Sequence, residues 1–428
     1  MVNILIAISA LAIFCLVKYL YRITKLEPAI IYLLMGILLG VILKKYGFEN
    51  IAEAVPGIEK YNSVALLFMF FTAGFSINVA QLKHSGKTTA KLLSAPAYAE
   101  AVISGGLIYM LLKLMPGMEL SIAEALMVSS IFAVSSAANV VPVCVNMLQR
   151  GKKGEHNIAG TMIIVSIIDG FITVPLVFVS LMILIADNTG RTYGVLQILV
   201  LAILTMACIL LALLMGLVLG RVELFAGRSL FKRLSRNDQG HMADMFLIFI
   251  AFAIAYIFGM ILYSLDGMKE MISTFGILIM CGMGIAINNY DRTGAGEIIG
   301  RKGSIIFQML GMPVIFIYVG AIIDMDTLTD PVTILLLLGI TAAAVIIKGT
   351  VSTAILKKQN YSAGEISFAR KCFIPKGVSL VNFSVLFSTI LTDNENLVSF
   401  MAMLAAAGII STMTIGLPML KKAGKEMK

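Results

Sequence analysis

The chain has 428 residues, of which 59% are hydrophobic and only 13% charged, and its mean hydropathy is +0.96. Because a soluble chain carries about 25% charged residues, this composition predicts an all-α polytopic membrane protein and excludes an ordinary soluble enzyme. The formal net charge of +9 does not indicate nucleic-acid binding. The basic residues lie in short loops between apolar segments, where they report orientation in the membrane.

Thirteen apolar segments have about the length that crosses a bilayer. The first could be taken for a signal peptide, but it lacks a basic start and a small-residue cleavage site, so we expect a retained helix. The second and the ninth are short for a bilayer. The thirteen expected spans are residues 1–20, 28–43, 62–80, 91–113, 122–149, 157–186, 192–220, 242–263, 270–287, 303–323, 331–356, 365–391 and 396–420.

Lysine and arginine are distributed unequally between the two sets of loops. With the N-terminus outside, the cytoplasmic segments hold 23 of these residues and the opposite loops hold 6. This bias supports the number of spans and predicts an outside N-terminus and a cytoplasmic C-terminus. We therefore expect a multi-pass protein of a prokaryotic cell membrane.

The loops leave no room for a soluble catalytic or nucleotide-binding domain, and we expect a single membrane domain over residues 1–428. The five cysteines stand singly in apolar segments, without the spacing of metal ligands or of a disulfide framework. No cluster of His, Asp and Cys has ligand or catalytic-triad spacing. We therefore expect neither a cofactor nor an enzyme.

Two long spans carry helix-breaking residues near mid-depth. The fifth groups Ser135, Ser136, Asn139 and Pro142, and the twelfth holds Pro375, Lys376 and Gly377. Spans four to six and eleven to thirteen flank the seventh symmetrically, so these two are the middle members of opposed triplets. Paired interrupted helices in corresponding positions indicate an inverted-repeat transporter, with two discontinuous helices crossing at the substrate site. Proline kinks without function are the alternative.

Ionisable residues inside a membrane are costly and are functional by default. Asp169 lies about a dozen residues into the sixth span, which places it near the bilayer centre at 1.5 Å per residue. A carboxylate there binds either a proton or a cation, and the two compete. The alternative is a carboxylate neutralised by a fixed partner. Lys348 in span eleven is a matching buried cation, and Glu100 in span four a second deep carboxylate that could be purely structural.

Lys376 lies at the break of the twelfth span, where its charge could offset a helix dipole. His84, His156 and His241 fall at cytoplasmic ends of spans. They could sense pH, but we expect ordinary solvated loop histidines. Asp324 and Asp326 are typical of a solvated outer rim.

Six segments, in this order and spacing, resemble the monovalent cation/proton antiporter superfamily over nearly the whole chain, particularly its bacterial sodium/proton and potassium-efflux branches. The segments are LLFMFFTAGFSINVAQLKHSGK, AVSSAANVVPV, SIIDGFITVPL, IFIYVGAII, IIKG and IPKGVSLV.

The resemblance implies an antiporter in which Asp169 is the essential aspartate and Ser135 contributes beside the ion. Together with Asn139, these residues are the expected ligands of the transported Na⁺ (alternatively K⁺ or Li⁺), with H⁺ as the counter-substrate. It also implies an elevator that works as a homodimer. Residues 88–186 and 331–420 would form the moving core, 1–80 and 242–323 the dimerising scaffold, and 192–220 the linker helix.

One position departs from the superfamily, which usually has a polar or acidic residue before the essential aspartate. Here it is Ile168, which removes the second carboxylate of the electrogenic members and favours exchange of one cation for one proton. The partner of Lys348 stays open: Asp169, Glu100 or neither. Two other functions remain: a gated potassium efflux pathway, whose members usually append a soluble regulatory domain, and a sodium-coupled organic-anion symporter with fewer spans.

Overall fold

The computed structural model describes residues 2–48, 51–55, 58–75, 86–113, 120–152, 154–173, 210–225, 269–290, 305–323, 330–377 and 395–427, with shorter pieces between them. Every named element within these ranges is helical, as expected from the composition. Four of the described helices are long and apolar enough to cross a membrane, at residues 28–45, 87–112, 331–358 and 398–426. The prediction of an all-α membrane fold is confirmed.

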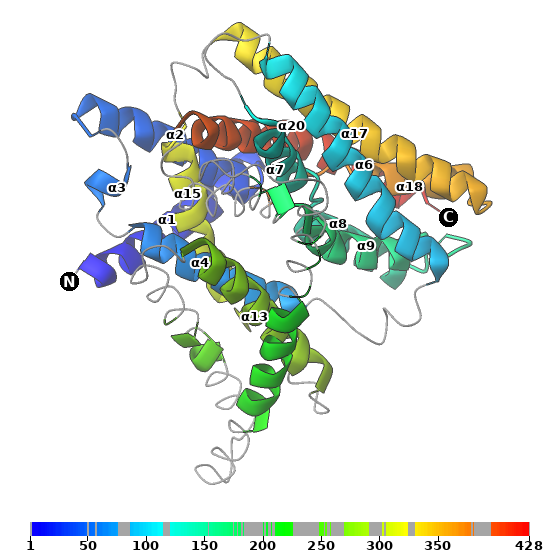
Figure 1. Ribbon diagram of the computed structural model, residues 1–428, viewed down its shortest axis with the longest axis horizontal. Helices are drawn as coiled ribbons and strands as arrows, with labels where there is room; N and C mark the ends of the chain where they lie inside the picture. Colours follow the sequence, from blue (N-terminus) through cyan, green and yellow to red (C-terminus); the bar gives the residue numbers. More distant parts are fainter. Residues whose placement is uncertain are drawn as a thin grey trace. The chain divides into compact units, whose positions relative to one another are not determined.

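The chain divides into two compact units. Unit 1 comprises residues 1–79, 207–322 and 385–390, and unit 2 comprises residues 80–206, 323–384 and 391–428. Each unit therefore collects segments from distant parts of the sequence, as the colours of Figure 1 show. Each is described by itself.

Unit 1 is built from helix pairs that approach closely through glycine. Its elements are α1 (Val2–Thr24), α2 (Pro28–Lys45), α3 (Ile51–Ala54), α4 (Ile58–Gly74), α13 (Lys269–Tyr290), the π-helix η1 (Phe307–Gly311) and α15 (Met312–Ala321). Helix α2 packs on α15, and α4 packs on α13. A Cβ on Gly36 would lie 2.9 Å from the Cα of Gly320, so only glycine allows this backbone contact.

Unit 2 contains two pairs of helices, and each pair consists of a long helix followed by a short helix that ends at a break. Its elements are α6 (Lys87–Leu112), α7 (Ile122–Phe132), α8 (Ala137–Gln149), α9 (Ile158–Ile172), α17 (Pro331–Lys358), α18 (Ala363–Cys372) and α20 (Glu395–Glu426). The long helices α6 and α17 lie side by side (Figure 1). Helix α7 follows α6, and α18 follows α17, and each of these short helices ends inside the unit.

The two short helices begin in the same way. Ser121 and Ser362 are their N-caps, and each forms a reciprocal capping box with the glutamate three residues later. Non-helical backbone follows α7 before α8 begins, and another break follows α18. These are the two interruptions expected in the fifth and twelfth spans.

The predicted position of one helix-breaking residue was wrong. Pro142 was expected to help interrupt the fifth span, but it lies inside α8, which is helical from Ala137 to Gln149. Pro142 is the sixth residue of α8, so it removes the hydrogen bond that an N–H there would donate to the carbonyl of Ala138, yet the helix continues past it. Pro375 and Gly377, by contrast, lie in the break that follows α18.

The other boundaries moved by a few residues. Helix α13 has 22 residues, so the ninth span is not short, while α2 has 18. The π-helix at the start of the tenth span was not predicted from the sequence. Most of the eighth span lies outside the described residues.

Candidate functional site

Asp169 lies on α9 with its side chain fully buried in unit 2. Its Oδ2 accepts a hydrogen bond from the backbone N–H of Ser135, at 2.8 Å. The same oxygen accepts one from the ammonium of Lys348, at 2.6 Å. A buried carboxylate needs such donors, and both come from other elements. The expected essential aspartate therefore faces the break between α7 and α8.

Lys348 lies on α17 and is also fully buried. Besides Asp169, its ammonium donates to the backbone oxygen of Ala133, the C-cap residue of α7. It also lies 3.4 Å from Oε2 of Glu100. Lys348 thus donates a hydrogen bond to the carbonyl of Ala133, which has no intrahelical partner because α7 ends there.

Glu100, fully buried on α6, joins the two lysines. Its Oε1 is the ion-pair partner of Lys376, which is buried in the break after α18. Glu100, Asp169, Lys348 and Lys376 thus form a cluster of two carboxylates and two ammonium groups whose formal charges cancel. We call these four residues the charge cluster. Cancellation at short range is what makes four buried charges tolerable.

The two breaks touch each other. Ser135 and Lys376 form an isolated antiparallel bridge, and the N–H of Ser136 donates to the oxygen of Pro375, at 2.8 Å. Ser135 and Lys376 each stand fourteen residues after their N-cap serines, so equivalent points of the two repeats meet. A Cβ on Gly377 would lie 2.6 Å from that of Ser136, so glycine is required at this crossing.

Helix α20 supports the crossing from the side. The N–H of Lys376 donates to Thr412 Oγ1 at 3.0 Å, and the hydroxyl of Thr412 donates to the oxygen of Gly408 at 2.6 Å. The extended backbone at the break is therefore fixed by hydrogen bonds, as non-helical backbone at membrane depth requires.

Three buried oxygens around Asp169 accept or donate no hydrogen bond in the described part of the chain. They are Asp169 Oδ1, Ser135 Oγ and Thr173 Oγ1. Ser135 was predicted from the sequence, but Thr173 was not. Its signal was available, since Thr173 follows Asp169 by four residues and so shares its helix face. Unpaired buried oxygens are costly, and a hard monovalent cation would satisfy them.

Asn139 stands in the first turn of α8, where its Nδ2 donates to Ser136 Oγ at 2.8 Å. This bond ties its amide to the N-cap residue of its own helix. The structure therefore brings together Asp169, Lys348, Glu100, Lys376 and Ser135, and holds Asn139 one turn away.

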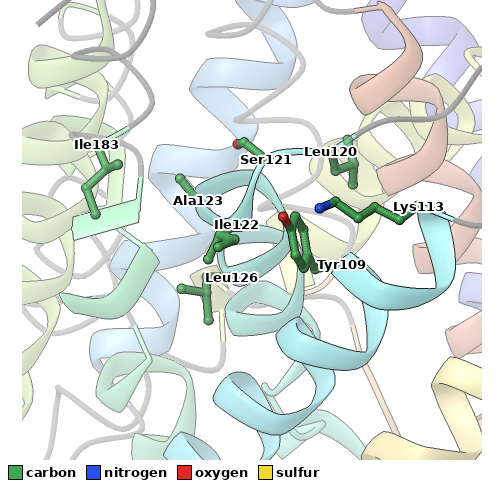
Figure 2. A pocket seen from close by; sticks show the side chains of 8 residues that line it. All are labelled: Tyr109, Lys113, Leu120, Ser121, Ile122, Ala123, Leu126 and Ile183. Carbon is green, nitrogen blue, oxygen red and sulfur yellow. The ribbon is translucent and has the colours of Figure 1, made fainter. Parts of the chain in front are cut away.

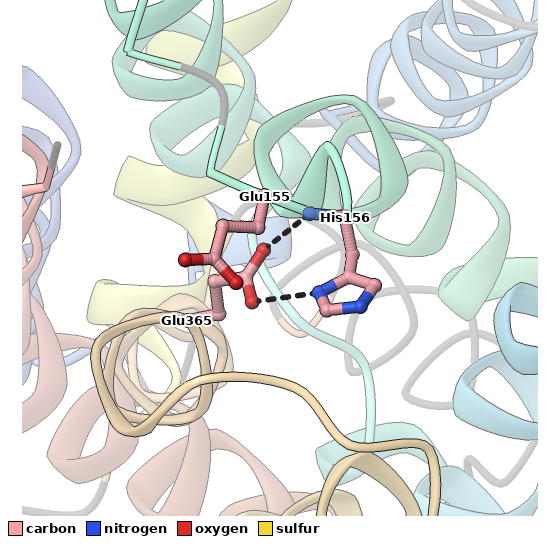
Figure 3. A group of neighbouring side chains, drawn as sticks. All are labelled: Glu155, His156 and Glu365. Atoms are coloured by element: carbon pink, nitrogen blue, oxygen red, sulfur yellow. Dashed lines mark hydrogen bonds and ion pairs between the residues drawn. The ribbon is translucent and has the colours of Figure 1, made fainter.

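His156 and Glu365 form a second polar contact, which we call the clasp. The backbone N–H of His156 donates to Glu365 Oε1 at 2.8 Å, and the His156 Nδ1 lies 3.0 Å from Glu365 Oε2. Glu155 completes a group of three side chains that could hold a metal ion (Figure 3). However, Glu365 already serves the capping box of α18, so the structure explains its burial without a metal. His84 and His241 lie outside the described residues, as do Asp324 and Asp326.

A cavity of about 760 Å³ lies elsewhere in unit 2 (Figure 2). Its polar groups have structural contacts: Ser121 caps α7, and the ammonium of Lys113 lies 4.6 Å from the centre of the Tyr109 ring. No residue of the charge cluster lines it. The lining residues are Tyr109, Lys113, Leu120, Ser121, Ile122, Ala123, Leu126 and Ile183.

Two broken helices that meet at a buried carboxylate and lysine are the architecture of an ion-coupled secondary transporter. A family model described as "Sodium/hydrogen exchanger, transmembrane" matches residues 9–422. The chain therefore belongs to the sodium/hydrogen exchanger family, and the resemblance seen in the sequence is confirmed.

The fold is similar to that of a solved structure, the sodium proton antiporter MjNhaP1 from Methanocaldococcus jannaschii at pH 8. The TM-score is 0.68 at 16% sequence identity, and the match covers 100% of this chain and 99% of that one. At this identity the similarity shows a shared fold. No match to a curated protein was found.

Proposed function

We propose that this protein exchanges a monovalent cation, Na⁺ first among the candidates, for H⁺ across the membrane, and that Asp169 binds the two ions in turn. One observation carries the proposal. Asp169 is buried beside the crossing of two helix breaks, with one oxygen held by a displaceable lysine and the other without a donor among the described residues. Such a carboxylate can take a proton or a cation, but not both at once.

The neighbouring oxygens suit a cation. The hydroxyls of Ser135 and Thr173 are buried and have no hydrogen-bond partner within the described ranges, and they offer neutral oxygen ligands next to the carboxylate. Oxygen donors are what hard cations prefer. The bond that Asn139 donates to Ser136 uses its amide nitrogen, so its amide oxygen could serve as a further ligand.

Alternating access would follow from an elevator. All the residues of the site belong to unit 2, which supports unit 2 as the moving core. Unit 1, with its glycine-mediated helix pairs, is the candidate for the dimerising scaffold. Crosslinking of cysteines introduced in α2 or α15 should capture a dimer in native membranes, and consistent failure would argue against this arrangement.

The orientation is proposed from the loop charges: N-terminus outside, C-terminus in the cytoplasm of a prokaryotic cell. Labelling of single introduced cysteines at both ends with an impermeant reagent tests it. Reaction of both ends from one side would mean that the number of spans is even.

The function itself is tested by reconstitution. Vesicles containing the purified protein and a pH-sensitive dye are challenged with Na⁺, K⁺, Li⁺ and choline. Proton movement with at least one alkali cation and none with choline is expected. Cation flux without proton movement would favour a gated potassium efflux pathway, and flux only with an added organic anion would favour a symporter.

A further inference from the structure

Lys348 is positioned between two carboxylates rather than beside one. Its ammonium lies 2.6 Å from Asp169 Oδ2 and 3.4 Å from Glu100 Oε2. Glu100 Oε2 is buried and accepts no hydrogen bond in the described part of the chain. Its other oxygen is occupied by Lys376. One carboxylate oxygen of Glu100 is therefore at ion-pair distance from Lys348 but accepts no hydrogen bond from the described residues.

Ion binding at Asp169 weakens the attraction between Asp169 and Lys348. A cation or a proton at Asp169 removes the negative charge that holds the ammonium, and a cation also repels it. A lysine displaced into apolar surroundings would lose its proton or prevent the ion from binding. Here a shift of less than about 1 Å, judged from ordinary hydrogen-bond lengths, would bring the ammonium to Glu100. The backbone oxygen of Ala133 could stay its acceptor throughout.

We propose that Glu100 receives the ammonium of Lys348 whenever Asp169 carries an ion, so that Lys348 stays protonated throughout the transport cycle. Glu100 is then a positioning residue, which acts on the site through Lys348. This inference rests on the proposed exchange at Asp169 and specifies how its charge is balanced.

The proposal fixes the stoichiometry. With Lys348 and Lys376 protonated and both carboxylates ionised, the charge cluster is formally neutral. A bound Na⁺ gives it a charge of one, and a proton on Asp169 gives it the same charge. The core would therefore carry equal charge in both directions, and one Na⁺ would be exchanged for one H⁺ without net charge movement.

The other charged groups near Lys348 do not substitute for Glu100. Lys376 repels Lys348, and Arg370 of α18, which lies against Gly349, is also basic. The Phe373 ring lies 5.2 Å from the ammonium and offers only a weak contact. Within the described residues, Glu100 is the only second anion beside Lys348.

The test compares Glu100→Gln with Glu100→Asp and with Ser104→Ala, a control one turn along α6 that removes a buried hydroxyl without a partner in the described part of the chain. Na⁺ affinity is measured as Na⁺-dependent thermal stabilisation in detergent, relative to choline, and as half-saturation of exchange in vesicles, each from pH 6.5 to 9.5. At pH 7, Glu100→Gln should weaken Na⁺ by at least roughly tenfold. This loss of Na⁺ affinity should become smaller as the pH rises, because Lys348 can then move away from Asp169 as a neutral amine. Glu100→Asp should restore most of the affinity, and Ser104→Ala should match wild type.

A double-mutant cycle identifies Lys348 as the target. In a Lys348→Gln background, adding Glu100→Gln should leave the pH dependence of Na⁺ stabilisation unchanged, because no ammonium remains to be received. If Glu100 only anchors Lys376, Glu100→Gln will lower thermal stability equally in both backgrounds and leave the pH profile of Na⁺ binding unchanged. That result overturns the proposal.

Membrane potential gives a second, independent test on the wild-type protein. Exchange should be insensitive to a potential set by valinomycin and a K⁺ gradient, or by a thiocyanate gradient if K⁺ is itself exchanged. A rate that increases severalfold with potential overturns the charge balance. Failure of the proposed function is distinguishable, because no alkali cation would then drive proton movement in wild type.

Discussion

Glu365 and Asp169 are two buried carboxylates of unit 2 that differ in how fully their oxygens are used. Glu365 is 1% exposed and Asp169 0%. Both oxygens of Glu365 have donors: His156 N–H on Oε1, and the N–H and hydroxyl of Ser362 on Oε2, at 2.8 to 3.1 Å. Among the residues that the structure describes, Asp169 has two donors on Oδ2 and none on Oδ1.

The donors also differ in kind. Those of Glu365 belong to backbone and short side chains fixed by the start of α18 and the turn before α9. One donor of Asp169 is the long side chain of Lys348, which has a second carboxylate within 3.4 Å. A carboxylate saturated by fixed donors stabilises a fold, whereas one with an open oxygen and a displaceable partner can exchange ions. Burial alone does not separate the two.

The strongest test of this contrast is Asp169→Asn. The amide is similar in size, so the protein should fold, but it neither ionises nor binds a proton, and we expect cation-driven proton movement to be abolished. Dye dequenching in vesicles measures the activity, and gel filtration in detergent checks the fold. Asp330→Asn, at the start of α17, is the matched control. Normal exchange by a well-folded Asp169→Asn protein would remove the central claim.

Glu365→Gln should have the opposite effect, lowering stability while leaving Na⁺ binding unchanged. An amide can serve only one side of the clasp as an acceptor and presents N–H groups to the other donors, so stability should fall by about 2 kcal/mol. The unfolding midpoint in detergent should decrease by a few degrees, while the Na⁺ half-saturation stays within about twofold of wild type. Glu155→Gln, at an exposed position in the turn that holds His156, should change neither. A loss of Na⁺ affinity without a loss of stability would place Glu365 among the ion-binding residues.

Much of this contrast was readable from the sequence. Asp169, Lys348, Glu100 and Lys376 were found because charges inside apolar spans are costly, and the breaks were found from Ser, Pro and Gly near mid-depth. Their pairing was not readable. Whether Lys348 meets Asp169 or Glu100 depends on where residues far apart in the chain come to lie, and the structure shows it near both.

The remaining differences have local causes. Pro142 was expected at the break because proline usually interrupts a helix, yet it follows the break and stands within α8. His156 was expected to be a solvated loop residue, and its side chain is 40% exposed, but its backbone joins a contact with a partner 209 residues away. Loop residues with long-range partners give no periodic signal in a sequence.

Ser135→Ala tests whether the Ser135 hydroxyl beside Asp169 is a ligand of the cation. The substitution keeps the backbone N–H that donates to Asp169 and removes only the unpaired hydroxyl. Loss of one neutral ligand, at about 1 kcal/mol, should raise the Na⁺ half-saturation about fivefold with little change in maximal rate. Ser104→Ala removes a buried hydroxyl on α6 that likewise has no partner among the described residues, and it should have no such effect. Equal behaviour of the two variants would mean that Ser135 is not a ligand.

Asp330 is a third kind of carboxylate, hydrogen-bonded but only half-buried, and its substitution should have the smallest effect. It is the N-cap of α17, and its Oδ2 accepts hydrogen bonds from the N–H and hydroxyl of Thr333, at 2.9 and 2.8 Å. The bond from the backbone N–H of Thr333, and then that from its hydroxyl, lower the pKa of Asp330 below its ordinary value of 3.8. A lowered folded-state pKa means that the carboxylate adds stability above about pH 4 and that this contribution is lost as pH falls through the folded-state value.

Asparagine also caps helices well. The Asp330→Asn protein should therefore unfold at a temperature only slightly below that of wild type at pH 7, because it lacks the negative charge that interacts favourably with the helix dipole. The difference in unfolding midpoint should begin to narrow as the pH is lowered from 6 to 3.5, because wild type then starts to lose the same charge. Thermal unfolding in detergent across that range measures it, and a difference that widens toward acid would show that the carboxylate is not stabilised by its cap.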